Sequence, residues 1–201
     1  MRIRIPHWRR ALVGATLAGA AALAQAGTFN CISGSVADCG LAETSLSWTW
    51  NGQDFTIANA GTGYVSEVYF DLGAGMSVSF LGGFGDVNFT LGAQPGSLPA
   101  GGSVGFVSDT AFDSDSGQGQ PTSGINTGET ATFRVLGGSL GSIDAGTLAA
   151  GIHVRSLVNG SASLVSTTGS VVTPVPEPES YAMALAGFAI IAVGARSRRK
   201  S

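Results

Sequence analysis

The residues best suited to chemistry in this chain lie in an acidic, irregular stretch. Asp113 and Asp115 alternate with serine, and Asp109 and Glu129 stand at the two ends of the same stretch. Alternating carboxylates are typical of calcium-binding loops, because the hard Ca²⁺ ion takes several oxygen ligands. The EF-hand pattern is not met, since glycines occupy its fifth and twelfth positions. Two interpretations stay open: a non-EF calcium site made by these four residues, or a solvated loop.

Trp48 and Trp50 form a second candidate site. In a strand, residues at i and i+2 share one face, so the two indoles lie side by side. Aromatic platforms of this kind let carbohydrate-binding modules stack on sugar rings. Leu46 shares the same face, which favours the core side of an early strand. The sequence therefore predicts buried indoles, with a sugar platform as the alternative.

Cys31 and Cys39 are the two cysteines of the chain. An even pair at short spacing is typical of a disulfide in an oxidising compartment. A metal site or a redox pair is disfavoured, because the Cys-x-x-Cys spacing is absent and the nearest candidate partner, His153, is far away in sequence. The spacing predicts a structural disulfide that closes a small loop.

Catalytic signatures are scarce. Residues 27–173 contain one histidine, His153, and neither a G-x-S-x-G nor an H-E-x-x-H motif. A glycosidase needs two carboxylates, but eleven acidic residues always offer some pair, so their presence indicates nothing. We therefore expect a protein that is not an enzyme and that needs no cofactor beyond the calcium considered above.

Apolar and polar residues alternate as in β-strands over most of residues 27–173, and these strands must position the candidate residues. Phe133 and Val135 oppose Thr132 and Arg134, and similar alternation recurs between turn residues. No segment within residues 27–173 shows a capped helical period. The sequence predicts an all-β fold, an antiparallel β-sandwich of immunoglobulin-like or jelly-roll type. Its predicted strands cover residues 46–50, 54–58, 65–72, 76–81, 87–91, 103–108, 130–136, 147–158 and 162–166.

The charge of this region excludes one class of partner. Residues 27–173 hold eleven Asp and Glu against two Arg, a net charge of −9, whereas the whole chain has −3. A nucleic acid, itself a polyanion, would be repelled, and no basic patch is available to bind it. The only lysine of the chain is Lys200. We expect no nucleic-acid partner.

The amino-terminal end has the features of a leader peptide. Four arginines precede residue 11, an apolar run spans 11–23, and Ala24-Gln25-Ala26 is an A-x-A cleavage site. Arg9 and Arg10 lack the flanking residues of a twin-arginine signal, so general secretion is favoured. The sequence predicts a signal peptide helix over 1–26 and an exported domain over 27–173.

The carboxyl-terminal end, residues 174–201, has three parts: a Pro-Glu-Pro motif within 175–179, which includes Val175, Pro176, Glu177 and Pro178, an apolar run over 181–195, and a basic stop over 196–200. A helix over 181–195 reaches roughly 22 Å, short of the ~30 Å hydrocarbon core of a bilayer. The run predicts a single short transmembrane helix that suits transient anchoring, with an ordinary permanent anchor as the alternative.

This order of motif, short apolar helix and basic stop resembles the PEP-CTERM sorting signal of Gram-negative bacteria. The resemblance implies an exosortase as processing partner, transient passage through the inner membrane, and a final place at the cell surface or in the extracellular matrix. It also implies association with extracellular polysaccharide production. The function expected is that of a non-catalytic surface or matrix protein, and the alternative is a carbohydrate-binding module acting on that polysaccharide.

Overall fold

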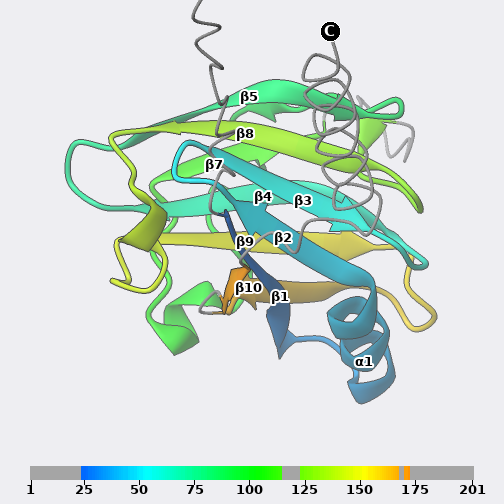
Figure 1. Cartoon of the computed structure of the whole chain (residues 1–201). Coiled ribbons are helices and arrows are strands. Elements are labelled where there is room, and N and C mark those ends of the chain that lie inside the picture. The colour runs from blue at the N-terminus through cyan, green and yellow to red at the C-terminus, as the bar shows by residue number, and fades with distance from the viewer. Residues whose placement is uncertain (1–23, 115–122, 168–169, 173–201) are drawn as a thin grey trace, which may run out of the picture.

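The computed structural model describes residues 24–114, 123–167 and 170–172 (Figure 1). This part of the chain is built mainly from strands. In chain order its elements are β1 (Ala24–Ser33), α1 (Val36–Ser45), β2 (Leu46–Trp50), β3 (Asp54–Asn59), β4 (Tyr64–Leu72), β5 (Ser77–Phe84), β6 (Thr90–Leu91), η1 (Gly101–Val104), β7 (Thr110–Asp113), β8 (Thr130–Leu136), η3 (Leu140–Ser142), β9 (Leu148–Arg155), β10 (Ala162–Ser166) and β11 (Ser170–Val172).

The described strands form one antiparallel sheet. Its order is β5-β8-β3-β2-β1-β10-β9-β4-β7-β6, and β11 pairs with β1 outside that order. Most neighbouring strands of the sheet are not consecutive in sequence, so the chain often passes from one part of the sheet to another between strands. The prediction of an all-β, antiparallel fold is confirmed.

The sheet curls into a nearly closed, barrel-like form, which corrects the prediction of a two-layered sandwich (Figure 1). The first half of β1 pairs with β2 and its second half pairs with β10. Because one strand serves both halves, the sheet does not divide, and strand twist turns it round on itself. Its edges approach each other through Phe80 of β5 and Phe89, whose ring centroids lie 5.6 Å apart.

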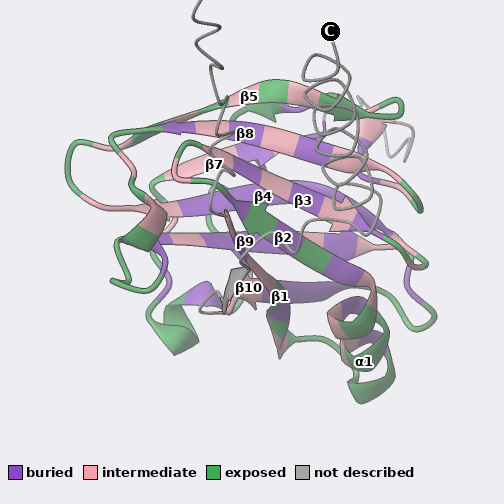
Figure 2. Cartoon of the chain, viewed as in Figure 1, coloured by how far each residue is buried: buried purple, intermediate pink, exposed green. Residues whose placement is uncertain are grey.

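Aromatic side chains fill the interior of the curled sheet. Buried residues alternate with more exposed ones along β2, β3 and β8 (Figure 2). Phe133 of β8 is central, because the ring centroids of Phe70, Phe80, Phe89 and Phe112 lie 5.2 to 5.6 Å from its own. Such pairs contribute about 1 kcal/mol each beyond their burial. The alternation found in the sequence therefore marks the core face.

Most predicted strands occur where alternation placed them. The ranges predicted for β2, β8 and β10 coincide with the observed ones, and those for β3, β4, β5 and β9 agree within three residues at each end. The strand predicted over 87–91 is reduced to the two residues of β6. The strand predicted over 103–108 is wrong, because η1 occupies its start and the backbone at Gly105 is left-handed. β7 instead lies in the stretch predicted to be irregular.

α1 contradicts the prediction that residues 27–173 form no helix. Ser35 caps it, since its hydroxyl oxygen accepts from the Asp38 amide at 3.1 Å. Asp38 is buried and its carboxylate also accepts from the Asn159 amide at 3.0 Å. Only Asp38 and Ala42 of the helix are buried. The helix thus lacks the apolar stripe by which helices are recognised in a sequence.

The outer face of β4, β9 and β10 is covered by the long connection between β6 and β7. Tyr69, Leu98 and Phe106 belong to a second buried cluster there, and the Tyr69 hydroxyl donates to the Pro95 carbonyl at 3.1 Å. Gly151 of β9 makes this close packing possible, because a Cβ at that position would lie 2.6 Å from Leu98. The barrel-like sheet therefore has apolar packing on both sides of β4 and β9.

Candidate functional site

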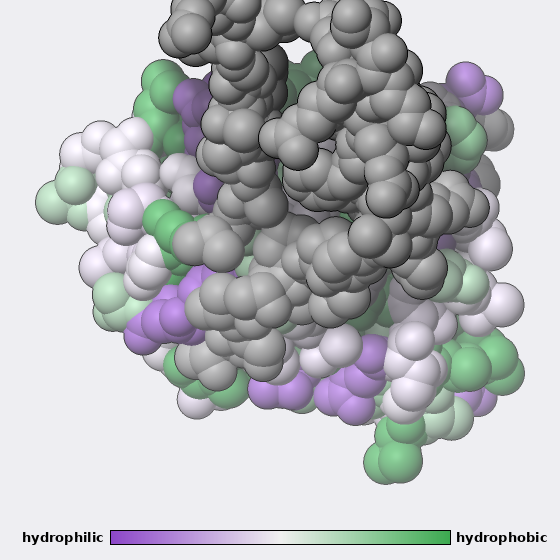
Figure 3. Space-filling model, in the orientation of Figure 1, coloured by the Kyte–Doolittle hydropathy of each residue, from purple (hydrophilic) through white to green (hydrophobic). Residues whose placement is uncertain are grey.

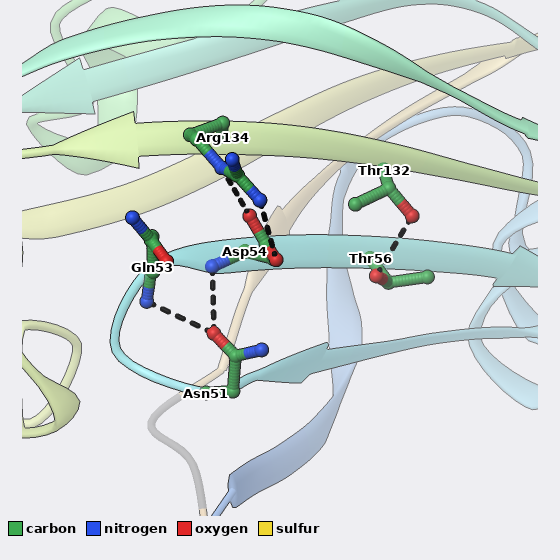
Figure 4. Close-up of polar contacts among 6 residues, drawn as sticks. All are labelled: Asn51, Gln53, Asp54, Thr56, Thr132 and Arg134. Atoms are coloured by element: carbon green, nitrogen blue, oxygen red, sulfur yellow. Dashed lines mark hydrogen bonds and ion pairs between the residues drawn. The ribbon is translucent and has the colours of Figure 1, made fainter.

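A partly exposed ion pair lies on the outer face of β3 and β8 (Figure 4). The Arg134 guanidinium donates to both carboxylate oxygens of Asp54, at 2.8 and 3.2 Å. The hydrogen bond from Arg134 lowers the pKa of Asp54. Asn51 Oδ1 accepts from the Asp54 amide at 2.7 Å, and Thr56 and Thr132 share a hydrogen bond of 3.0 Å across the same two strands. These contacts fix the β2–β3 turn and the register of β8.

A second polar group has two buried members, Glu67 and Ser163. Asp113, Glu67, His153 and Ser163, here called the polar row, are register partners across β7, β4, β9 and β10. Glu67 is 1% exposed, and its carboxylate accepts hydrogen bonds from Arg155 and from Ser66. Burial raises the pKa of Glu67, while the Arg155 charge opposes that rise. The row thus holds a buried carboxylate with one cation as its partner.

His153 in the polar row is held neutral at pH 7. Its Nδ1 lies 3.0 Å from the Ser163 hydroxyl oxygen, and Ser163 is 1% exposed. Burial, helped by the nearby charge of Arg155, lowers the pKa of His153 to about 4. Tyr69, two residues after Glu67 on the same strand, has a raised pKa because it is buried and lies near that carboxylate. Burial thus shifts the pKa values of three ionisable groups on one face of β4 and β9: Glu67, Tyr69 and His153.

The polar row resembles the acid–base groups of enzymes only in residue type. A serine nucleophile must reach its substrate, but the Ser163 hydroxyl is buried against His153. Glu67 is likewise enclosed and engaged by Arg155. These contacts join side chains of neighbouring strands: Glu67 of β4 binds Arg155 of β9, and His153 of β9 contacts Ser163 of β10. Sequence reasoning missed the row, although an acidic residue inside the apolar run of β4 was a signal for it.

The predicted calcium ligands are not brought together. Asp109 accepts a hydrogen bond from the Leu72 amide at 2.8 Å, and Glu129 accepts from the amides of Asn126 and Asp86. Asp113 instead stands in the polar row. Among the described residues no group of three or more Asp, Glu, His or Cys side chains could hold a metal ion. The structure thus does not bring Asp109, Asp113 and Glu129 into one group. Asp115 lies outside the described residues, and the four-residue calcium site stays a prediction.

The two indoles lie in the core. Trp48 is 1% exposed and Trp50 is 0% exposed. Their N–H groups donate to the carbonyls of Thr28 and Ser139, at 2.8 and 2.9 Å. Trp48 also stacks on Phe55, with centroids 5.4 Å apart. A sugar platform needs exposed ring faces, so the prediction of buried indoles is confirmed and that of a platform is wrong.

The disulfide between Cys31 and Cys39 is confirmed. It joins the end of β1 to the first turn of α1, so it fastens the helix to the sheet. Glu43 adds a second connection, because its carboxylate accepts from the Cys31 amide at 2.8 Å. The disulfide therefore has a structural role, as the spacing predicted.

A small pocket lies where η1 and the residues after it meet β9 and β10. It has a volume of about 190 Å³, and Asp71, Phe106 and Val165 contribute to its lining. Pockets for small ligands usually span ~300–1,000 Å³. The pocket is thus smaller than a typical ligand site.

The acidic excess persists in the folded domain. Arg134 and Arg155, the two cations of residues 27–173, are both in ion pairs. On the face drawn in Figure 3 the visible described residues mix hydrophilic and hydrophobic side chains. Within the described ranges neither arginine is thus free to form a basic patch.

The described part of the chain contains no helix that is both long and apolar enough to cross a membrane. The transmembrane helix predicted over 181–195 and the predicted leader up to residue 23 lie outside the described residues. So does the Pro-Glu-Pro motif.

Comparison with protein families decides what the tail is. Residues 174–200 match the family model of the PEP-CTERM protein-sorting motif. The chain carries a PEP-CTERM sorting motif. Neither the curated proteins nor the solved structures gave a match.

The PEP-CTERM motif implies an exosortase-type processing partner, as the resemblance indicated. It also indicates export and transient membrane anchoring before placement at the cell surface. One residue separates the end of β11 from the matched residues, so the sorting motif is joined to the barrel-like domain without a long linker.

Proposed function

We propose that this chain is a non-catalytic surface or extracellular-matrix protein of a Gram-negative bacterium. It leaves the cytoplasm by means of an amino-terminal leader and is anchored briefly in the inner membrane. An exosortase-type enzyme then processes it at the tail. The observation that carries the proposal is the match of residues 174–200 to the PEP-CTERM protein-sorting motif.

The domain supports this proposal in two ways. Its disulfide suits an oxidising compartment outside the cytoplasm. Its most enzyme-like groups, Ser163 and Glu67, are each 1% exposed and bonded to neighbouring side chains. A buried nucleophile and an enclosed carboxylate favour structural roles over catalysis.

We propose that the processed protein lies among extracellular polysaccharide. This part rests on the resemblance of the tail alone, because Trp48 and Trp50, the residues that suggested direct sugar binding, are buried. We therefore propose the polysaccharide as a neighbour and not as a ligand of the two indoles.

The test follows the tail of the full chain in a host with an intact exosortase gene and in the same host without it. We expect mass spectrometry to find a carboxyl terminus shortened at the motif only when the enzyme is present. Glu177→Ala should block that cut, and Glu179→Ala serves as the matched control. Equal processing in both hosts would contradict the proposal.

The non-catalytic part is tested separately. The purified protein is incubated with ester, peptide and glycoside substrates, alongside His153→Ala. We expect no turnover by either protein. Turnover that is lost in His153→Ala would show an enzyme and overturn this part.

A further inference from the structure

The first residues of β1 belong to the segment that the leader was predicted to remove. Gln25 pairs with Trp50 and Ala26 with Thr49 on one side, in β2. On the other side, residues 24–26 pair with residues 170–172 of β11. The segment Ala24–Ala26 therefore belongs to a strand with neighbours on both sides.

The Gln25 side chain is also built into the domain. Gln25 is 1% exposed, and its Nε2 donates to Asp144 Oδ2 at 2.5 Å. Its strand neighbour Trp50 is 0% exposed. A buried residue with a hydrogen bond to a distant loop is typical of a folded domain and not of a discarded leader.

A cut after Ala26 would be costly for the fold. It would remove Gln25, the register partner of Trp50 in β1, and leave Trp50 paired only with Phe55 of β3. It would also remove the strand segment with which β11 pairs among the described residues. Backbone N–H and C=O groups left unpaired in the sheet lose free energy comparable to a hydrogen bond each.

The sequence offers another A-x-A site directly upstream. Ala22-Leu23-Ala24 has small residues at both recognition positions, and a cut after it removes the whole apolar run over 11–23 with the leader. We propose that the leader peptidase hydrolyses the peptide bond between Ala24 and Gln25. Water is the co-reactant, and the products are a carboxylate on Ala24 and an α-ammonium on Gln25.

The new terminus suits its surroundings. Gln25 Oε1 is buried and has no hydrogen-bond partner among the described residues. The cut places an additional donor, the α-ammonium, on this same residue. It also adds one cation to a domain in which both arginines are already paired.

This inference rests on the proposed export, and one measurement separates the two. The full chain is produced in a Gram-negative host, and its exported form is examined by amino-terminal sequencing and intact mass. We expect a start at Gln25, or at its cyclised form that has expelled ammonia. A start at Gly27 or any other cut position overturns this inference alone, whereas an uncut chain contradicts the proposed export and the inference with it.

Two matched variants sharpen the result. Ala22→Leu places a large residue at the recognition position three residues before the bond cut in our proposal, and we expect loss of the Gln25 start. Ala26→Leu changes the alternative site alone, and we expect the Gln25 start to persist. The reverse pattern, with loss of processing only in Ala26→Leu, would overturn the proposal.

Discussion

Arg134 and Arg155 form the same kind of ion pair in two different surroundings. The side chains of Arg134 and Asp54 are 39% and 24% exposed, whereas those of Arg155 and Glu67 are 44% and 2% exposed. The pKa of Asp54 is lowered and that of Glu67 is raised. Burial of the carboxylate, and not the presence of the arginine, therefore decides the direction of the shift.

The difference teaches what each arginine contributes. On the exposed face, water solvates the Asp54 carboxylate whether or not Arg134 is present, so the pair adds little. On the covered face, Glu67 has lost most of its water, and Arg155 compensates for that loss. Matched changes on the two faces should thus have unequal effects.

The largest effect is expected for Arg155→Met. The substitution keeps an apolar stem but leaves the Glu67 carboxylate buried without its cation. We expect a loss of about 3 kcal/mol in the free energy of unfolding, at the lower end for a buried pair because Arg155 is partly exposed. Urea unfolding of the purified protein at pH 7 measures it. Glu67→Gln in the Arg155→Met background should restore part of the loss, and no restoration would contradict the role given to Glu67.

The second effect is a loss of stability in acid through His153. Its folded pKa of about 4 lies below the ordinary value of 6.5, so the unfolded chain binds a proton first as the pH falls. Stability contributed by neutral His153 is therefore present above pH 6.5 and lost between 6.5 and about 4. We expect a loss on the order of 2 kcal/mol across this window.

The measurement for His153 is urea unfolding at several pH values, compared with His153→Gln. Glu67 acts in the opposite direction, because its raised pKa favours the folded state as it takes up a proton. The difference between the two proteins isolates the histidine. Identical pH profiles would contradict the expected titration.

The third effect concerns the covering connection. Gly151→Ala places a Cβ 2.6 Å from Leu98, whose flexible end must shift, so we expect a loss of about 1 kcal/mol. Gly96→Ala is the control within the same connection, since a Cβ there meets nothing within 4 Å. Thermal unfolding of both variants measures the difference. Equal stability would mean that the connection is not packed against β9 as described.

The smallest effect is expected for Arg134→Met, the counterpart of Arg155→Met. We expect a loss of stability at pH 7 much smaller than that of Arg155→Met, because water screens the pair, and the same urea unfolding measures it. The lowered pKa of Asp54 contributes stability above the ordinary Asp pKa that is lost as the pH falls below it. Arg134→Met should reduce this acid-side loss. A loss as large as that of Arg155→Met would remove the contrast between the two faces.

Alternation made much of the fold predictable. Phe133 and Val135 were correctly assigned to one face because a half-buried strand repeats every two residues. The sandwich was not correct, because the closure of a sheet depends on which strands pair, and β1 pairs with β2 and β10 at once. α1 was missed because packing, capping and the disulfide hold a helix that lacks an apolar stripe.

The candidate site was less predictable than the fold. The Cys31–Cys39 disulfide follows from local spacing and compartment, and the sorting motif follows from a short contiguous pattern. The Glu67–Arg155 contact joins residues 88 positions apart, so only the register of β4 and β9 reveals it. The sequence gives no sign that Asp109 and Glu129 accept hydrogen bonds from different backbone amides, because these contacts depend on the folded chain.

The pairing of β1 with β11 places the two ends of the described chain side by side. Ala24 and Val172 are register partners, so the described chain enters and leaves the sheet at the same pole. If the chain is exported as proposed, the leader and the sorting tail both join the domain at this pole. The two processing enzymes of that proposal would then act at the same end of the domain.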